Sequence, residues 1–220
     1  MDLKSIQNKI PKELYEILEK EIKKLRPAQE KSINKGLLEG KNLLVCTPTA
    51  SGKTLIAELA ALKSIIEGKG KAIYIVPLKA LASEKYRDFR RKYDKIAKIA
   101  LSIGEIDSSD PHLAEYDLIV CTAEKMDSLL RHHAPWLPNI ATVIVDEIHL
   151  LNDQERGPTL EILLTILKKL LKNVQIIGLS ATIGNAQELA EWLDADLVVD
   201  EWRPVKLHKG VYFEGKIEFY

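Results

Sequence analysis

The amino-acid sequence predicts an α/β fold: a doubly wound, mostly parallel sheet with helices on both faces. The first observation behind this prediction is a series of short apolar runs, each continuous rather than alternating with polar residues. Continuous apolar runs are expected of parallel strands that helices cover on both faces. The second observation is that amphipathic segments with helical period separate these runs. Strands and helices that alternate in this way predict βαβ units and a doubly wound sheet.

The elements follow one another along the chain. Strands are predicted at residues 42–46, 72–76, 99–103, 117–121, 142–145, 175–179 and 197–199. Helices are predicted near residues 11–23 and 28–39, and at 54–67, 78–93, 124–132, 159–171 and 186–193. Pro158 suits the first turn of the helix that follows it, and Gly68 suits the end of the 54–67 helix. Residues 201–220 break the alternation and predict one or two extended segments after Arg203 and Pro204.

The composition allows a sizeable core but no strongly charged surface. Of the 220 residues, 46% are hydrophobic, and 32 Lys and Arg residues balance 32 Asp and Glu residues. A chain with zero net charge is not a polybasic nucleic-acid binder, so any binding of nucleic acid must come from a local face. No apolar run approaches the roughly 18 residues of a membrane-spanning helix, and the N-terminus lacks a signal-peptide core. We expect a cytoplasmic protein with no membrane partner.

Several residues that attract attention are expected to be structural. Cys46 and Cys121 lie in the apolar runs NLLVC and DLIVC, which predicts two buried thiols of a reduced protein and no disulfide. The five histidines show no metal-ligand spacing. Trp136, in HHAPWLPN, is expected to anchor a packed loop rather than to stack on a base.

The stretch TPTASGKT resembles a phosphate-binding loop, G-x-x-x-x-G-K-[ST], except that its first residue is threonine. It follows a predicted strand and opens a predicted helix, which is the context that such a loop requires. Backbone N–H groups and the positive end of the helix would hold phosphate oxygens. Lys53 would reach the β- and γ-phosphates of ATP, and the Thr54 hydroxyl would bind Mg²⁺. The residues of this predicted loop are Thr47, Pro48, Thr49, Ala50, Ser51, Gly52, Lys53 and Thr54. The motif alone leaves open a kinase, a GTPase, a transporter ATPase or a motor.

The run VIVDEIH narrows these classes, because an apolar strand that ends in two carboxylates is the expected second half of an ATPase site. Asp146 would hold Mg²⁺ through its coordination shell. Glu147 would orient and deprotonate the attacking water as a general base. A GTPase is disfavoured, since no N-K-x-D guanine-reading motif follows the Asp146 strand. A module that binds nucleotide without turnover stays open as an alternative, although Glu147 argues against it.

Together, TPTASGKT, DEIH and GLSAT resemble superfamily 2 helicases, in which the first loop position is often alanine or threonine. Further motifs are similar to the Ski-like branch, and in particular to archaeal Hjm-type DNA repair helicases, which are related to eukaryotic HELQ. These motifs are PLKALA, GEIDS, TAEKMDSL, ERGPTLE and WRPV. The resemblance implies that residues 1–200 form a first RecA-like ATP-binding helicase domain of the P-loop NTPase class. It implies that residues 201–220 lead to a second RecA-like domain of the same polypeptide.

The resemblance also assigns roles to individual residues. In LRPAQ, within the N-terminal helices 1–40, Gln29 matches the glutamine that reads adenine, whereas Arg26 departs from the aromatic residue or proline often found there. His149 would bond across the ATP site, and Ser180 and Thr182 would couple it to a nucleic-acid track. One wall of a single-stranded track would be formed by Lys79, Gly104, Thr122 and Lys125.

By this resemblance, the chain is expected to be the first motor domain of an ATP-dependent DNA helicase. The whole protein would unwind DNA 3′-to-5′ in repair or at stalled forks, as a monomer on single-stranded or forked DNA, with ATP and Mg²⁺ as cofactors. A Ski-like RNA helicase is the alternative, because the motor motifs barely distinguish the two. Superfamily 2 enzymes bring a closing arginine from the second domain. We therefore expect the 220-residue chain to bind nucleotide without motor-like hydrolysis.

Overall fold

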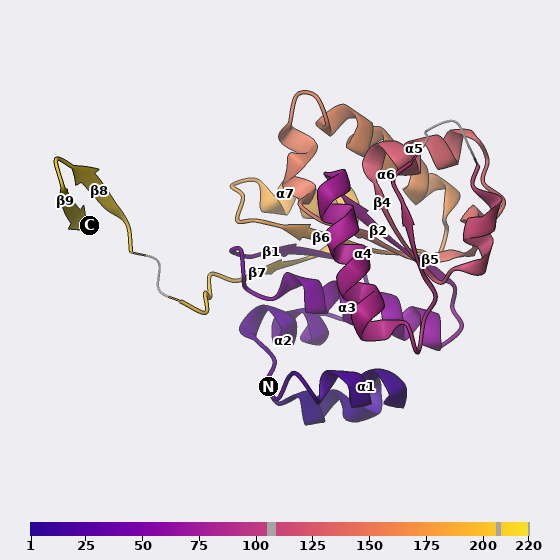
Figure 1. The fold of residues 1–220 in the computed structure, drawn as a ribbon, viewed down its shortest axis with the longest axis horizontal. Helices are drawn as coiled ribbons and strands as arrows, with labels where there is room; N and C mark the ends of the chain where they lie inside the picture. The colour runs from indigo at the N-terminus through magenta and orange to yellow at the C-terminus, as the bar shows by residue number, and fades with distance from the viewer. Residues whose placement is uncertain (105–108, 206–207, 220) are drawn as a thin grey trace.

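The computed structural model describes residues 1–104, 109–205 and 208–219, and its main body is built on one parallel sheet (Figure 1). The strand order is β3-β4-β2-β5-β6-β1-β7, and every neighbouring pair in it is parallel. The strands are β1 (Leu43–Cys46), β2 (Lys71–Val76), β3 (Ile99–Ser102), β4 (Leu118–Thr122), β5 (Ile140–Val145), β6 (Gln175–Ser180) and β7 (Asp196–Val199). The predicted fold class is confirmed.

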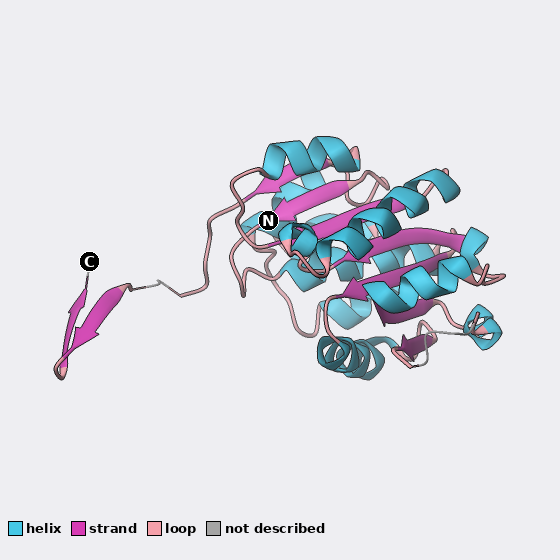
Figure 2. Cartoon of the chain, turned by 90° about the horizontal axis from the view of Figure 1, so that it is seen from above, coloured by secondary structure: helices cyan, strands magenta, loops and turns pink. Residues whose placement is uncertain are grey.

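Helices cover both faces of this sheet, as Figure 2 shows. The α-helices are α1 (Lys12–Leu18), α2 (Pro27–Asn34), α3 (Lys53–Ile66), α4 (Lys79–Tyr93), α5 (Ala123–Arg131), α6 (Gly157–Leu170) and α7 (Ala186–Leu193). Short 3-10 helices are η1 (Leu3–Lys9), η2 (Pro111–Glu115), η3 (Leu137–Asn139) and η4 (Ile148–Asn152). Within β1, Leu43 and Val45 pack into one apolar cluster with α1 to α4, and Leu44 and Cys46 pack into another with α5 to α7. The continuous apolar runs therefore reflect burial on both faces.

The first two predicted helices are shorter than the 11–23 and 28–39 segments. The chain turns after α1 because residues 22–25 come back to the N-terminus, where Leu3 N donates to Lys23 O at 3.0 Å and Leu25 N donates to Met1 O at 2.9 Å. The second helix gives way to turns after Asn34, and Gly36 there has a left-handed φ of 97°. Backbone hydrogen bonds to the N-terminus end the first helix, and a turn at Gly36 follows the second. Both helices thus end before the helical pattern of apolar residues in the sequence does.

The predicted structural roles of Trp136 and the two cysteines are confirmed. Trp136 is 1% exposed, and its Nε1 donates to the Asp110 carbonyl at 3.2 Å, so it holds one loop against another. Cys46 and Cys121 are buried and are not in a disulfide. Burial raises the pKa of the Cys121 thiol to about 12, so it stays protonated at neutral pH.

The segment after β7 leaves the body (Figure 1). Asp200 is 7% exposed and forms an ion pair with Lys31 at 2.8 Å, which fixes the point of departure. Beyond it, β8 (Gly210–Phe213) and β9 (Lys216–Phe219) form an antiparallel hairpin. Of the one or two extended segments predicted here, the structure has two. Within the described ranges, no helix has both the length and the apolar character needed to cross a membrane.

The start of α6 requires a glycine, and this gives a test of the fold. A Cβ on Gly157 would lie 2.2 Å from the Leu151 carbonyl oxygen of η4, a backbone atom that cannot swing aside. Gly157→Ala is expected to lower the free energy of unfolding by about 1–3 kcal/mol, the range of an overpacked core. Urea unfolding measures this change.

The matched control is Gly184→Ala, since a Cβ at Gly184 meets nothing within 4 Å and its φ is not left-handed. The control should change the free energy of unfolding by less than about 0.5 kcal/mol. Equal unfolding midpoints for the two variants would contradict the packing of α6 against η4.

Candidate functional site

The parallel sheet brings the sequence motifs to one edge, because all of its strands point the same way. β1 leads into the TPTASGKT loop, β5 into DEIH, and β6 into the SAT residues. These three strands are neighbours in the order β5-β6-β1. In open α/β sheets, ligands bind outside the carboxyl ends of the strands. The motifs therefore meet where a ligand site is expected.

The TPTASGKT loop is tightly folded between β1 and α3. Thr47 is fully buried, its backbone N donates to Ser180 O at 3.1 Å, and its hydroxyl is 2.7 Å from the Ser51 hydroxyl. Two residues have left-handed backbone: Ala50 with φ 62° and Gly52 with φ 93°. Thr47 thus acts as an internal tie of the loop. A glycine at this position would lack the hydroxyl that makes the contact with Ser51.

Lys53 begins α3 and bridges the loop to β6. Its Nζ donates to Ser180 O at 2.9 Å and to Thr47 O at 3.4 Å. Both acceptors are neutral carbonyls, so the ammonium keeps its full charge for an anion. The N-terminal N–H groups of α3 add a positive end at the same place. Together these groups concentrate positive charge and free N–H donors where an anion can bind.

Gln29 and Arg26 lie against this loop from the N-terminal side. Gln29 Oε1 accepts from Arg26 N at 2.8 Å, and its Nε2 donates to Gly52 O at 2.9 Å. Arg26 donates to Ala50 O at 2.6 Å, and its guanidinium lies 5.5 Å from the centre of the Trp202 ring. Gln29 is therefore 4% exposed and holds the loop with both ends of its amide. That it reads adenine stays a prediction.

Asp146 follows β5 directly and is held from three sides. Its N donates to Ile75 O at 2.8 Å, its Oδ1 accepts from Glu147 N at 3.0 Å, and its Oδ2 accepts from the Tyr74 hydroxyl at 2.8 Å. Burial and then the Asp146 charge raise the pKa of Tyr74 well above its usual value, so Tyr74 stays a hydrogen-bond donor. The Lys85 ammonium lies 4.0 Å from Asp146 Oδ2 and donates to the Thr54 hydroxyl at 3.1 Å. Thr54 and Asp146, the two predicted magnesium ligands, thus face a common cation.

Glu147 takes an unusual backbone conformation at the start of η4. Its φ of 53° and ψ of 43° are left-handed, a region that costs a non-glycine residue roughly 1–3 kcal/mol. Its Oε2 lies 3.3 Å from His149 Nδ1. Strained backbone of this kind concentrates at functional sites.

Ser180 and Thr182 differ in their surroundings. The Ser180 carbonyl accepts from both Thr47 N and Lys53 Nζ. The Ser180 hydroxyl is buried beside the Cys46 thiol, with which it interacts. Thr182 is exposed beyond the end of β6. Their predicted coupling role remains a prediction.

The predicted nucleic-acid contacts lie at the other half of the same edge, after β2, β3 and β4. Lys79 and Gly104 are exposed there, and residues 105–108 of the GEIDS motif lie outside the described residues. Thr122 caps α5 by accepting from Lys125 N at 3.4 Å.

Lys125, which was expected to form part of the wall of the nucleic-acid track, has a buried side chain. Its side chain is 3% exposed and its Nζ lies 2.8 Å from Asp110 Oδ2. An ion pair this deeply buried keeps the ammonium from a nucleic-acid strand unless the pair opens. Contact between the Lys125 side chain and nucleic acid stays a prediction.

Three residues that contact the predicted site residues were not identified from the sequence. Tyr74 lies inside an apolar strand, where nothing marks it. Arg26 appeared only as a departure from a motif. Lys85 carried a usable signal, since it falls on the inward stripe of α4 with Ala82 and Phe89, at helical spacing.

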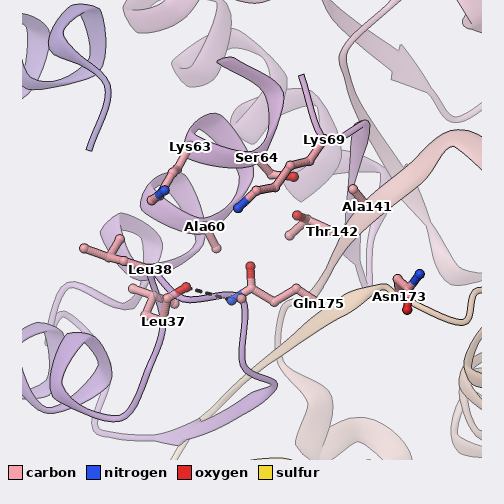
Figure 3. Close-up of a pocket in the computed structure, with 11 residues that line it drawn as sticks. Leu37, Leu38, Ala60, Lys63, Ser64, Lys69, Ala141, Thr142, Asn173 and Gln175 are labelled. Atoms are coloured by element: carbon pink, nitrogen blue, oxygen red, sulfur yellow. Dashed lines mark hydrogen bonds between the residues drawn. The ribbon is translucent and has the colours of Figure 1, made fainter. Parts of the chain in front are cut away.

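A separate pocket of about 300 Å³ lies at the opposite, amino edge of the sheet (Figure 3). Gln175 at the start of β6 and Thr142 near the start of β5 line it, together with Lys63 and Ser64 of the last turn of α3. A helix presents its negative end there, which disfavours phosphates. Within the described residues, no group of three or more His, Cys, Asp or Glu side chains could hold a metal ion.

A family model for the DEAD/DEAH box helicases matches residues 26–189. The match begins at Arg26, beside the phosphate loop, and runs past DEIH and SAT. The chain belongs to the DEAD/DEAH box helicase family.

Two similar proteins support this family membership, and both are named Hel308. The ATP-dependent DNA helicase Hel308 of Methanocaldococcus jannaschii is 57% identical over 205 residues, which cover 90% of this chain and 17% of that protein. The ATP-dependent DNA helicase Hel308 of Pyrococcus abyssi is 52% identical over 207 residues, which cover 94% of this chain and 28% of that protein. The resemblance to Hjm-type superfamily 2 helicases is confirmed.

A solved structure agrees with the fold. The DUF1998 helicase MrfA bound to DNA matches with a TM-score of 0.73 and 25% sequence identity, over 88% of this chain and 30% of that chain. The chain thus spans less than a third of each of these matched proteins.

Proposed function

We propose that this chain is the first motor domain of an ATP-dependent DNA helicase and binds Mg²⁺-ATP at the carboxyl edge of its sheet. The observation that carries the proposal is the meeting of the two motif halves. Lys53 and the N-terminus of α3 bring positive charge and N–H donors together, and the Lys85 ammonium lies beside them between Thr54 and Asp146, at 3.1 and 4.0 Å. An anion site beside a pair of oxygen donors suits a nucleoside triphosphate with its metal ion.

The donor set fits magnesium, because a hydroxyl and a carboxylate are the oxygen ligands that this hard cation takes in phosphate-transfer sites. Thr54 and Asp146 would hold the ion, which when bound neutralises charge on the phosphate oxygens. Lys53 would move from the carbonyls of Thr47 and Ser180 to the β- and γ-phosphates. Glu147 would orient the attacking water and accept its proton. His149 would bond across the ATP site, and its Nδ1, which makes no hydrogen bond among the described residues, lies 3.3 Å from the Glu147 carboxylate.

The nucleic-acid role rests on the relatives and on the topology of the sheet. The two matched Hel308 proteins are named as DNA helicases, and the MrfA structure holds DNA. In this chain the loops after β2, β3 and β4 lie on the same edge as the ATP site, and loops of this kind contact backbone phosphates without reading sequence. We propose that single-stranded DNA lies along them, near Lys79, Gly104 and Thr122, and that Ser180 and Thr182 couple the ATP site to this track.

For the longer protein we propose 3′-to-5′ unwinding of forked DNA in repair, by a cytoplasmic monomer whose second RecA-like domain follows the 201–220 segment. The motor motifs suit an RNA helicase almost equally well. Unwinding of matched DNA and RNA forks by the longer protein separates these functions. Activity restricted to RNA would exclude the DNA assignment.

Lys53→Ala is expected to weaken binding of a non-hydrolysable ATP analogue about 10- to 100-fold, the loss of a charge-assisted hydrogen bond to phosphate. Adenosine has no phosphate for Lys53 to contact, so its affinity should change little. Equilibrium titration of this chain measures both. Lys12→Ala, at a side chain that is 87% exposed, is the control. Equal affinity of the wild type and Lys53→Ala for the analogue would rule out the phosphate site.

Gln29→Ala is expected to reduce the preference for ATP over GTP, because a glutamine amide can pair with both N6 and N7 of adenine. The amide now bonds Arg26 N and Gly52 O, so base reading requires it to exchange these partners. Competition binding of ATP and GTP measures the preference, with the exposed Gln187→Ala as control. Equal weakening of ATP binding and GTP binding would show instead that Gln29 acts only through the phosphate loop.

Glu147→Gln is expected to preserve nucleotide binding but to lower ATP hydrolysis by about 10²–10⁴-fold, since the amide keeps the shape of the side chain and cannot accept the proton. Steady-state hydrolysis by the longer protein with single-stranded DNA measures this, and Glu155→Gln at an exposed position is the control. A loss below about tenfold would assign the base to another residue.

A further inference from the structure

Lys85 is a charged residue on the inward face of α4. It lies on α4 between Ala82 and Phe89, which are both buried, so the helix turns Lys85 toward the sheet. Its side chain is 19% exposed. A lysine on the inward stripe of a helix loses water contacts, and it requires acceptors in return.

The acceptors of Lys85 are groups of the candidate ATP site. Its Nζ donates to Thr54 Oγ1 at 3.1 Å and lies 4.0 Å from Asp146 Oδ2, whose side chain is 14% exposed. The Tyr74 ring lies 6.0 Å from the ammonium, and the Tyr74 hydroxyl donates to the same Asp146 oxygen. The ammonium therefore lies near oxygen atoms of α3 and of the residue that follows β5, on the side of the Tyr74 ring of β2.

We propose that the Lys85 ammonium is a built-in placeholder cation, which neutralises Asp146 and engages Thr54 when no divalent ion is bound, and which must move aside for one. The inference rests on the proposed Mg²⁺-ATP site. A lysine suits the role because its ammonium is a compact point charge on a flexible stem, so it can leave without moving the helix. Lys85 acts through Thr54 and Asp146 and is thus a positioning residue.

Two opposite consequences follow for nucleotide binding. Without a divalent ion, the ammonium offsets the repulsion between the Asp146 carboxylate and the phosphates, so losing it should weaken binding. With a divalent ion, the ammonium is a competitor of like charge, so losing it should ease occupation of the site. The ratio of the nucleotide affinities with and without a divalent ion therefore measures the placeholder effect. A general structural defect would weaken nucleotide binding equally in both conditions.

The experiment measures the affinity of this chain for a fluorescent non-hydrolysable ATP analogue in EDTA and across a Mg²⁺ titration. Lys85→Met keeps the length of the side chain and removes its charge. We expect the ratio of Mg²⁺ to EDTA affinity to rise about fivefold, the size of effect of one partly exposed ion pair, and the Mg²⁺ midpoint to fall. Lys85→Arg keeps a cation and should stay nearer to the wild-type ratio. Lys95→Met removes an exposed charge just after α4 and should leave the ratio unchanged.

An unchanged ratio in Lys85→Met would overturn the inference. If Lys53→Ala still weakens binding of the analogue in the same assay, the ATP site stands and only the placeholder role fails. If Lys53→Ala has no effect, the proposed function itself fails.

Should Lys85→Met not fold, acylation of lysines in the wild type, followed by mass spectrometry, gives the same decision. With the analogue bound, labelling of Lys85 relative to Lys95 should rise when Mg²⁺ replaces EDTA. Equal labelling in the two conditions would contradict displacement.

Discussion

The parallel pairing of β1 with β6 is the constraint on which the candidate site depends. At the last pair, Cys46 with Ser180, the Ser180 carbonyl accepts from Thr47 N at 3.1 Å and from Lys53 Nζ at 2.9 Å. One oxygen atom thus fixes both the first residue of the phosphate loop and its lysine. Since β5 pairs with β6 on the other side, the same alignment sets how far Asp146 lies from that lysine. A shift of β6 by one residue would move both halves of the site.

The charges at this edge are arranged before any ligand arrives. Lys53 rests on neutral carbonyls, whereas Asp146 is met by the Tyr74 hydroxyl, the Glu147 N–H and the Lys85 ammonium. A partly buried carboxylate needs such donors, because burial of an unpaired charge is costly. The arrangement leaves the cationic half ready for phosphate and keeps the anionic half neutralised. Ligand binding would then require side-chain movement of Lys53 and Lys85, whereas the backbone of the loop and of β5 is already in place.

The sheet and its strands could be predicted from the sequence, because strands that are buried on both faces consist of continuous apolar runs. The two halves of the ATP site could be predicted because phosphate loops require particular residues at fixed positions. It could not show what the side chains do once α4 and β2 pack together. Tyr74 looks like any core residue until β5 lies beside it. Lys125 was expected to contact nucleic acid, because nothing in the local sequence reveals Asp110 as its partner. Gln29 was expected to face a base, and in the structure its amide ties Arg26 N to Gly52 O, a contact across 23 residues.

The most direct test of the account is the location of a bound nucleotide on this chain. Backbone amide NMR shifts, followed during titration with Mg²⁺ and a non-hydrolysable ATP analogue, map it residue by residue. The account predicts the largest changes at residues 47–54, Asp146 and Ser180, at the carboxyl edge of the sheet. Changes centred instead on Lys69, Asn173 and Gln175, which line the pocket at the amino edge, would contradict it.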